Sequence, residues 1–168
     1  MTQGHLTATR IIAAQIYSAL PKELKAEVNL PDLQQAAMLH DYGKVLIPKE
    51  ILNKKGTLTQ EEKKIIELHS EFGYELLKQQ GVKDNVLNLI KYHHQKPDGS
   101  GYPTVNQDFK YDLSVQILEA ADKYSALTED RPYHKARTKN EALDIIQKDV
   151  DSGIISQAVF DALKKGIY

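Results

Sequence analysis

The stretch that decides the fold is Met38-Leu39-His40-Asp41-Tyr42-Gly43-Lys44, which follows an apolar run that begins at Leu33. Apolar residues in that run recur at helical spacing, so we expect a helix that ends at Gly43. A histidine and an aspartate side by side at this place do not suit an ordinary helix surface. We interpret His40 and Asp41 as two metal ligands at one helix terminus, because an imidazole binds one cation and a carboxylate can bridge two.

The composition is that of a globular protein with a single domain spanning residues 1–168. Of the 168 residues, 41% are hydrophobic and 27% are charged, and this length supports one core. The formal net charge is −1, and no long run of lysine or arginine occurs, which argues against a nucleic-acid polymer as partner. No apolar run approaches the ~20 residues of a membrane-spanning helix, so we expect no membrane insertion.

The sequence contains no cysteine, which excludes disulfides and thiolate metal sites. Any metal must therefore be held by imidazole and carboxylate groups. That ligand set suits iron, manganese, nickel or zinc in a catalytic site rather than a structural one. The lack of cysteine also favours a cytoplasmic location.

The apolar periodicity is helical almost throughout, and no strand pattern or internal repeat is found, so we predict an all-α fold. One long helix is expected from Thr59, its N-cap with Glu62 in a capping box, to Gly81, with Leu68 and His69 on its buried side. The other expected segments are one through Ile12, Ile16 and Leu20, then residues 30–40, a short turn at 48–52, and helices at 83–94, 113–127, 140–150 and 156–165.

Five of the six histidines fall on or at the ends of apolar helical segments: His5, His40, His69, His93 and His94. A single such histidine is more often a core residue with a hydrogen-bond partner than a metal ligand. Together with Asp41 and Asp122, however, this set would leave many buried polar groups to find separate partners, which is costly. A shared centre of two cations satisfies all of them at once.

The order of these residues resembles the HD superfamily of metal-dependent phosphohydrolases. Longer strings are similar to the HD-GYP subfamily: His40 to Pro48 with Ile51-Leu52, His93-His94-Gln95-Lys96-Pro97-Asp98-Gly99-Ser100-Gly101-Tyr102-Pro103, and Asp130-Arg131-Pro132-Tyr133. The resemblance extends over nearly the whole chain. It implies a helical bundle of about five core helices followed by C-terminal helices.

The resemblance also implies an activity: hydrolysis of cyclic di-GMP to the linear dinucleotide or GMP, by attack of a hydroxide that bridges two metal ions. Iron or manganese is the metal that the family favours, with zinc or nickel as alternatives. Two cations about 3.5–4 Å apart can hold both the attacking and the leaving oxygen of a phosphodiester. Members of this family often carry an upstream sensory or receiver domain and form homodimers, so we expect a catalytic domain taken from a longer protein.

Matched residue by residue, the resemblance assigns roles to particular side chains. Asp41 is the bridging ligand, and Lys44 holds a substrate phosphate close to the reacting centre. For His134 an ordinary surface position is an equally good interpretation. The metal ligands are His5, His40, Asp41, His69, His93, His94 and Asp122, and the substrate-binding residues are Lys44, Asp98, Gly99, Gly101, Tyr102, Arg131 and His134.

The chain departs from the family pattern at four positions. Gln95 replaces a usual glutamate, Gln116 a common arginine, and Ser125 a frequent second aspartate; we expect Gln95 and Gln116 to face the substrate. Met1 stands where members with three metals have a glutamate, so two metals are expected. These departures leave open a binding module without turnover. A further alternative is an HD phosphohydrolase for another nucleotide.

Overall fold

The computed structural model describes residues 3–106, 109–131 and 134–168. Within these ranges every regular element is a helix, and Arg131 and His134 form an isolated antiparallel bridge. The all-α prediction is confirmed. The elements are α1 Gln3–Ala19, α2 Lys22–Lys25, α3 Leu30–Leu39, the 3₁₀ helix η1 Tyr42–Leu46, α4 Lys49–Leu52, α5 Gln60–Glu67, α6 His69–Gln79, α7 Asp84–Tyr92, α8 Leu113–Thr128, α9 Lys139–Asp151 and α10 Gln157–Gly166.

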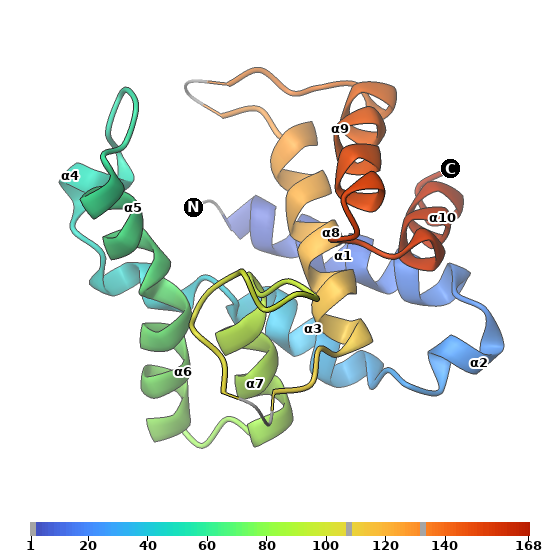
Figure 1. The fold of residues 1–168 in the computed structure, drawn as a ribbon, viewed down its shortest axis with the longest axis horizontal. Coiled ribbons are helices and arrows are strands. Elements are labelled where there is room, and N and C mark those ends of the chain that lie inside the picture. Colours follow the sequence, from blue (N-terminus) through green and yellow to red (C-terminus); the bar gives the residue numbers. More distant parts are fainter. Residues whose placement is uncertain (1–2, 107–108, 132–133) are drawn as a thin grey trace.

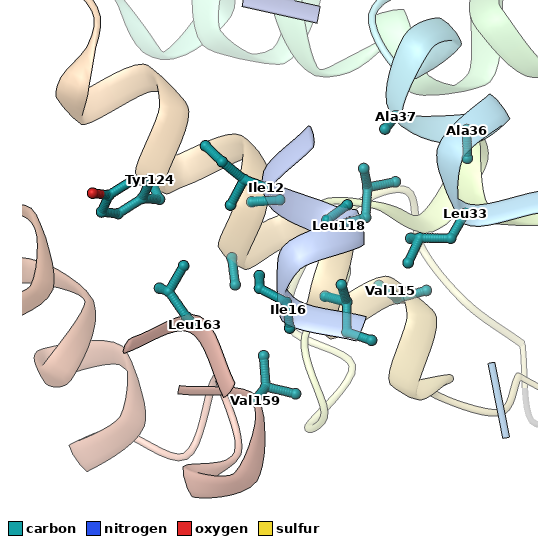
Figure 2. Packing of buried hydrophobic residues seen from close by; sticks show 14 of the residues in the cluster. Ile12, Ile16, Leu33, Ala36, Ala37, Val115, Leu118, Tyr124, Val159 and Leu163 are labelled. Carbon is teal, nitrogen blue, oxygen red and sulfur yellow. The ribbon is translucent and has the colours of Figure 1, made fainter. Parts of the chain in front are cut away.

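The core forms where α1 packs against α3, α8 and α10. Figure 2 shows Ile12 and Ile16 of α1 between Leu118 of α8 and Val159 and Leu163 of α10. These side chains are almost entirely removed from water, and burying each contributes roughly 1.5–3 kcal/mol. α1 and α8, far apart in sequence, thereby become neighbours at the centre of the fold.

A second group of helices is attached to this core through α7, which packs on α3 and on α6. η1 packs along α6. In Figure 1, α4 and α5 extend away from the rest of the chain, and no residue of either helix is buried. No helix in the described ranges has the length and apolar character required to cross a bilayer.

Several helices begin at side chains that accept a hydrogen bond from the first turn. Thr59 and Glu62 form the predicted capping box, and Thr138 with Glu141 forms another at α9. Asn29 accepts from the backbone N–H of Asp32. Such caps stabilise a helix by about 1 kcal/mol each, and they explain why the predicted starts agree with the observed ones.

The prediction of one helix from Thr59 to Gly81 is wrong, because the chain bends at Leu68 and forms α5 and α6. Leu68, expected on the buried side, is 41% exposed, and its N–H donates to the carbonyl of Ile65 in a tight turn. The bend turns α6 onto η1 and α7, which lets His69, the first residue of α6, lie buried. The four-residue helix α2 was not predicted.

The sequence predicts that Gly43 ends a helix, but Gly43 lies inside η1 and allows a close backbone contact with α6. A Cβ atom on Gly43 would overlap the carbonyl oxygen of His69 and the backbone nitrogen of Gly73. The backbones of η1 and α6 therefore touch at a point where a side chain would separate them. Because Asp41 precedes η1 directly, this contact brings Asp41 next to His69.

We expect Gly43→Ala to destabilise the protein by about 3 kcal/mol or more, because rigid backbone atoms must move to admit the methyl group. Urea unfolding measures this change. Gly81→Ala is the matched control: Gly81 has a φ of +78° and no atom near its would-be Cβ, so only a backbone cost of about 1–2 kcal/mol applies. Equal losses in the two variants would contradict the close backbone contact.

Candidate metal centre

The seven predicted ligands come together although they are spread from the first turn of α1 to the middle of α8. Helix ends supply most of them: His40 is the C-cap of α3, His69 begins α6, and His93 is the C-cap of α7. His5 lies on α1 and Asp122 on α8. The helix packing that forms the core thus also closes the site.

The ligand atoms form two groups, within each of which they all lie within 4.8 Å of one another. One group has three imidazoles, and the other has two imidazoles and two carboxylates. Each has the composition of a site for a divalent cation bound by nitrogen and oxygen. The groups are His69, His93 and His94, and His5, His40, Asp41 and Asp122.

Asp41 belongs to the second group and also faces His69 of the first. Its Oδ2 is 3.0 Å from Nε2 of His40, and its Oδ1 is 3.3 Å from Nε2 of His69. One carboxylate thus presents one oxygen to each group. This is the arrangement that a bridging ligand requires, and the side chain is 5% exposed.

Three of the histidines are oriented in the same way. Nδ1 of His40 donates to the carbonyl of Ala37, Nδ1 of His69 to that of Ile66, and Nδ1 of His93 to that of Ile90, at 2.8, 2.7 and 2.6 Å. A carbonyl oxygen only accepts, so these bonds place the proton on Nδ1. In its neutral form, which is the form that binds a metal, each ring directs its Nε2 lone pair into the site, as histidine ligands of metals do.

The contact between His69 and His93 tests whether these residues fit a cation. Their Nε2 atoms are 3.3 Å apart, and both protons are already committed to carbonyl oxygens on the Nδ1 side. Two lone pairs then face each other in a buried place, which is unfavourable unless a positive charge lies beside them. The donor set therefore fits a metal ion.

Lys44 lies at the same cluster, but its contact is with the candidate ligand Asp41. Its Nζ is 3.1 Å from Oδ1 of Asp41, and its side chain is 29% exposed. The ammonium group therefore lies at the accessible edge of the ligand cluster. There it can reach an anionic group that approaches from solvent while it remains close to the carboxylate.

The Gly-Tyr-Pro loop, residues 99–103, lies beside the centre. The ring of Tyr102 stacks on that of His94, with centroids 4.9 Å apart and planes at 28°, and lies 6.3 Å from the ring of His69. Gly99 has a φ of +76°, which glycine adopts without strain. Asp98 is exposed, and its Oδ1 accepts from the N–H of Ser100, so its described contact is within the loop.

Arg131 and His134 are less closely tied to the centre than the other predicted substrate residues. Arg131 is exposed, with Nε 3.9 Å from Oε2 of Glu129, and Glu129 in turn lies 3.4 Å from Nδ1 of His5. His134 pairs with Arg131 through backbone hydrogen bonds. Met1, Pro132 and Tyr133, which are positions of the family pattern, lie outside the described residues.

A protein-family model for the HD domain matches residues 3–158.

The chain belongs to the HD-domain family. The family prediction made from the histidine and aspartate strings is confirmed.

Curated relatives of this HD domain include two bacterial enzymes. The 3′3′-cGAMP-specific phosphodiesterase 1 of Vibrio cholerae is 34% identical over 151 residues, covering 89% of this chain and 35% of that protein. A cyclic di-GMP phosphodiesterase of Thermotoga maritima is 33% identical over 142 residues, covering 83% of this chain and 38% of that protein. The HD domain thus spans little more than a third of either relative.

The fold is shared with a solved structure, an HDG“Y”P protein from Bdellovibrio bacteriovorus. It matches with a TM-score of 0.72 and 17% identity, over 98% of this chain and 51% of that chain. At this identity the likeness concerns the fold alone. The predicted HD-type helical bundle is confirmed.

Two residues that the sequence did not mark as functional orient His5. The hydroxyl of Ser125 is 3.1 Å from Nδ1 of His5, and the hydroxyl of Thr9 is 2.8 Å from that of Ser125. Nε2 of His5 is then left facing Asp122 at 2.9 Å. The sequence carries a helical spacing signal for both residues, since Thr9 follows His5 by four residues and Ser125 follows Asp122 by three, whereas the family pattern marks Ser125 only as a departure.

The expectation that Gln116 and Gln95 face the substrate is wrong. Oε1 of Gln116 accepts from the backbone N–H of Ser156, the N-cap of α10, so Gln116 joins α8 to the start of α10. Gln95 is fully buried and bonds to the backbone of its own loop. The family's arginine position has thus become a packing position in this HD domain.

Burial and charge divide the histidines into two kinds. Burial by itself lowers the pKa of His40, but hydrogen bonds with Asp122 and Asp41 raise this pKa to about 10. Although burial opposes it, the His40 contact holds the pKa of Asp41 well below its usual range. Burial lowers the pKa of His69 and His93, and that of His94 to about 4. Without metal, a proton on His40 therefore balances the carboxylates.

These shifts predict that the metal-free HD domain is most stable near pH 6.5. His40, with its pKa raised, contributes stability that is complete below pH 6.5 and is lost as the pH rises towards 10. His94, with its pKa lowered, destabilises the fold as the pH falls from 6.5 towards 4. Urea unfolding of chelator-treated protein between pH 4.5 and 9.5 should show a loss on both sides, on the order of a few kcal/mol.

His40→Gln serves as the control for the alkaline side. It removes the raised pKa, so stability between pH 6.5 and 9.5 should become nearly flat while the acid side keeps its slope. An unchanged alkaline slope in this variant would show that another group causes it.

Proposed function

We propose that this HD domain is a metal-dependent phosphodiesterase that hydrolyses a cyclic dinucleotide, with cyclic di-GMP as its preferred substrate. The observation that carries the proposal is the position of Asp41, whose two oxygens face His40 and His69, one from each group of candidate ligands. The names of the relatives support the substrate class, since they include phosphodiesterases for cyclic di-GMP and for 3′3′-cGAMP.

Two divalent cations, iron or manganese, are proposed as cofactors. Four side chains would hold the first cation: His5, His40, Asp41 and Asp122. Three imidazoles would hold the second, with Asp41 as the shared ligand: His69, His93 and His94. Bound there, the cations would supply Lewis-acid activation of the phosphodiester and of the attacking water.

The chain's own groups act around this centre. The negative charge of Asp41 is shared between the two groups and limits the repulsion between neighbouring cations. Lys44 is proposed to move its ammonium group from Asp41 to a non-bridging phosphate oxygen, where a charged hydrogen bond is strong. Tyr102 presents a ring beside the centre that can contact a base. Arg131 and the loop around Gly99 and Gly101 are proposed to complete the nucleotide site.

The metal proposal predicts about two equivalents of bound metal, measured by elemental analysis after reconstitution with Mn²⁺ or Fe²⁺. Asp41→Asn keeps the shape of the side chain but removes the charge that both groups share. Losing an outer partner costs about 10- to 100-fold in metal affinity, so losing this ligand should cost more than 100-fold in calorimetry. Asp144→Asn, on the exposed surface of α9, is the control and should retain both ions.

The activity proposal predicts that metal-loaded protein converts cyclic di-GMP to the linear dinucleotide or GMP. The products are followed by chromatography, and 3′3′-cGAMP and cyclic di-AMP are tested as substrates in parallel. Lys44→Met should lower kcat/KM about 10- to 100-fold, since it removes one charged hydrogen bond. Lys63→Met, at an exposed position of α5, should leave it unchanged.

The same substrate panel separates the alternatives. Preference for 3′3′-cGAMP would keep the reaction class and change the substrate. Tight binding of cyclic di-GMP by fully loaded protein without any product would indicate a binding module. Turnover confined to other nucleotides would indicate a different HD phosphohydrolase.

A further inference from the structure

Gln95 follows the candidate ligand pair His93-His94 in the sequence and is fully buried. The oxygen and the nitrogen of its side-chain amide both bond to the loop that follows. Oε1 accepts from the backbone N–H groups of Lys96 and Gly101, each at 2.8 Å. Nε2 donates to the carbonyl of Pro103 at 2.8 Å. Two donors on one side and an acceptor on the other leave a single orientation of the amide.

These bonds hold the loop against the chain segment that carries the ligands. A Cβ atom on Gly101 would overlap the carbonyl oxygen of His94 and come within 2.7 Å of Cα of Gln95. Only glycine therefore allows the loop backbone to lie this close. The N–H of Tyr102 points to the same carbonyl of His94, at 3.4 Å.

The result of this packing is the position of the Tyr102 ring. Gly101 and Pro103, the residues on either side of Tyr102, are both bonded to Gln95, so the tyrosine backbone is fixed from both directions. Its ring stacks on His94 and is partly exposed. One face of the ring thus supports a ligand histidine at the edge of the metal centre.

We propose that Gln95 is a positioning residue for substrate: it holds Tyr102 at the edge of the centre, where the tyrosine contacts a base of the bound cyclic dinucleotide. This inference rests on the proposed function. It assigns Gln95 to the grip on the nucleotide rather than to the metal centre or the chemical step. The glutamine is therefore a working replacement for the usual glutamate and no mark of lost function.

The chemistry of the three bonds explains why an amide serves here. The carbonyl of Pro103 can only accept, and Pro103 is buried, so an ionised carboxylate at position 95 would place two acceptor oxygens against each other. Such a contact in a place without water is unfavourable. Glutamine satisfies all three backbone groups and adds no charge beside the ligand histidines.

The test compares two substrates that differ in whether they carry bases. Cyclic di-GMP needs the base contact, whereas bis(p-nitrophenyl) phosphate offers the metal centre only a phosphodiester with small aryl groups. In Gln95→Met, which keeps the size of the side chain but loses the three bonds, we expect two bound metal ions. KM for cyclic di-GMP should rise about 10- to 100-fold, as the loss of several hydrogen bonds allows, with kcat changed much less. Turnover of bis(p-nitrophenyl) phosphate should fall by less than about threefold.

A double-mutant cycle shows whether Gln95 acts through Tyr102. Tyr102→Ala should raise KM for cyclic di-GMP as Gln95→Met does, and the double variant should be no worse than the more severe single variant, because both remove the same contact. Gln79→Met, at an exposed position of α6, is the control for introducing methionine. If Gln95→Met does not fold, Tyr102→Ala is measured on both substrates instead, and KM should rise for cyclic di-GMP while turnover of bis(p-nitrophenyl) phosphate changes little.

Three results would overturn the inference. The first is an equal fall in turnover of both substrates together with loss of metal, which would make Gln95 a support of the metal centre. The second is additive effects in the double variant, and the third is an unchanged KM in Tyr102→Ala. Wild-type protein that holds two metals but neither binds nor hydrolyses cyclic dinucleotides would instead overturn the proposed function.

Discussion

Asp41 has one carboxylate oxygen 3.0 Å from His40 and the other 3.3 Å from His69. This position of Asp41 depends on how the surrounding helices pack. Asp41 follows His40, the C-cap of α3, and His69 is the first residue of α6. The two meet because the backbone at Gly43 touches that of α6. The hydrophobic packing of α1, α3 and α8 then brings His5 and Asp122 into the same group as His40 and Asp41. A buried set of imidazoles and carboxylates is costly to form, and the positive charge of the proposed cations would offset that cost for both groups.

The departures from the family pattern have separate consequences. Ser125 takes part in orienting His5 through its hydroxyl, so it supports a candidate ligand. Gln116 accepts a hydrogen bond from the N–H of Ser156 and has become part of the packing between α8 and α10. Gln95 bonds to the loop that carries Tyr102. Loss of the usual residue therefore does not mean loss of the site, because each replacement has a defined partner.

The sequence predicts those features that depend on local chemistry. The capping box of Thr59 and Glu62, the helical class and the candidate ligand set all follow from short-range patterns, and the structure brings the side chains of that set together. The bend at Leu68 could not be predicted, because the apolar spacing continues through it and only the packing of α6 on η1 requires it. The contact of Gly43 with His69 and the roles of Gln95 and Gln116 likewise depend on partners brought close by tertiary packing.

The most direct test of a shared centre is the electron paramagnetic resonance spectrum of protein loaded with two equivalents of Mn²⁺. Two ions bridged by Asp41 should lie about 3.5–4 Å apart, so their spins should couple and give a spectrum with the features of an exchange-coupled pair. Two independent six-line Mn²⁺ signals at the same loading would show that the ions occupy separate sites. That result would contradict the bridging position of Asp41.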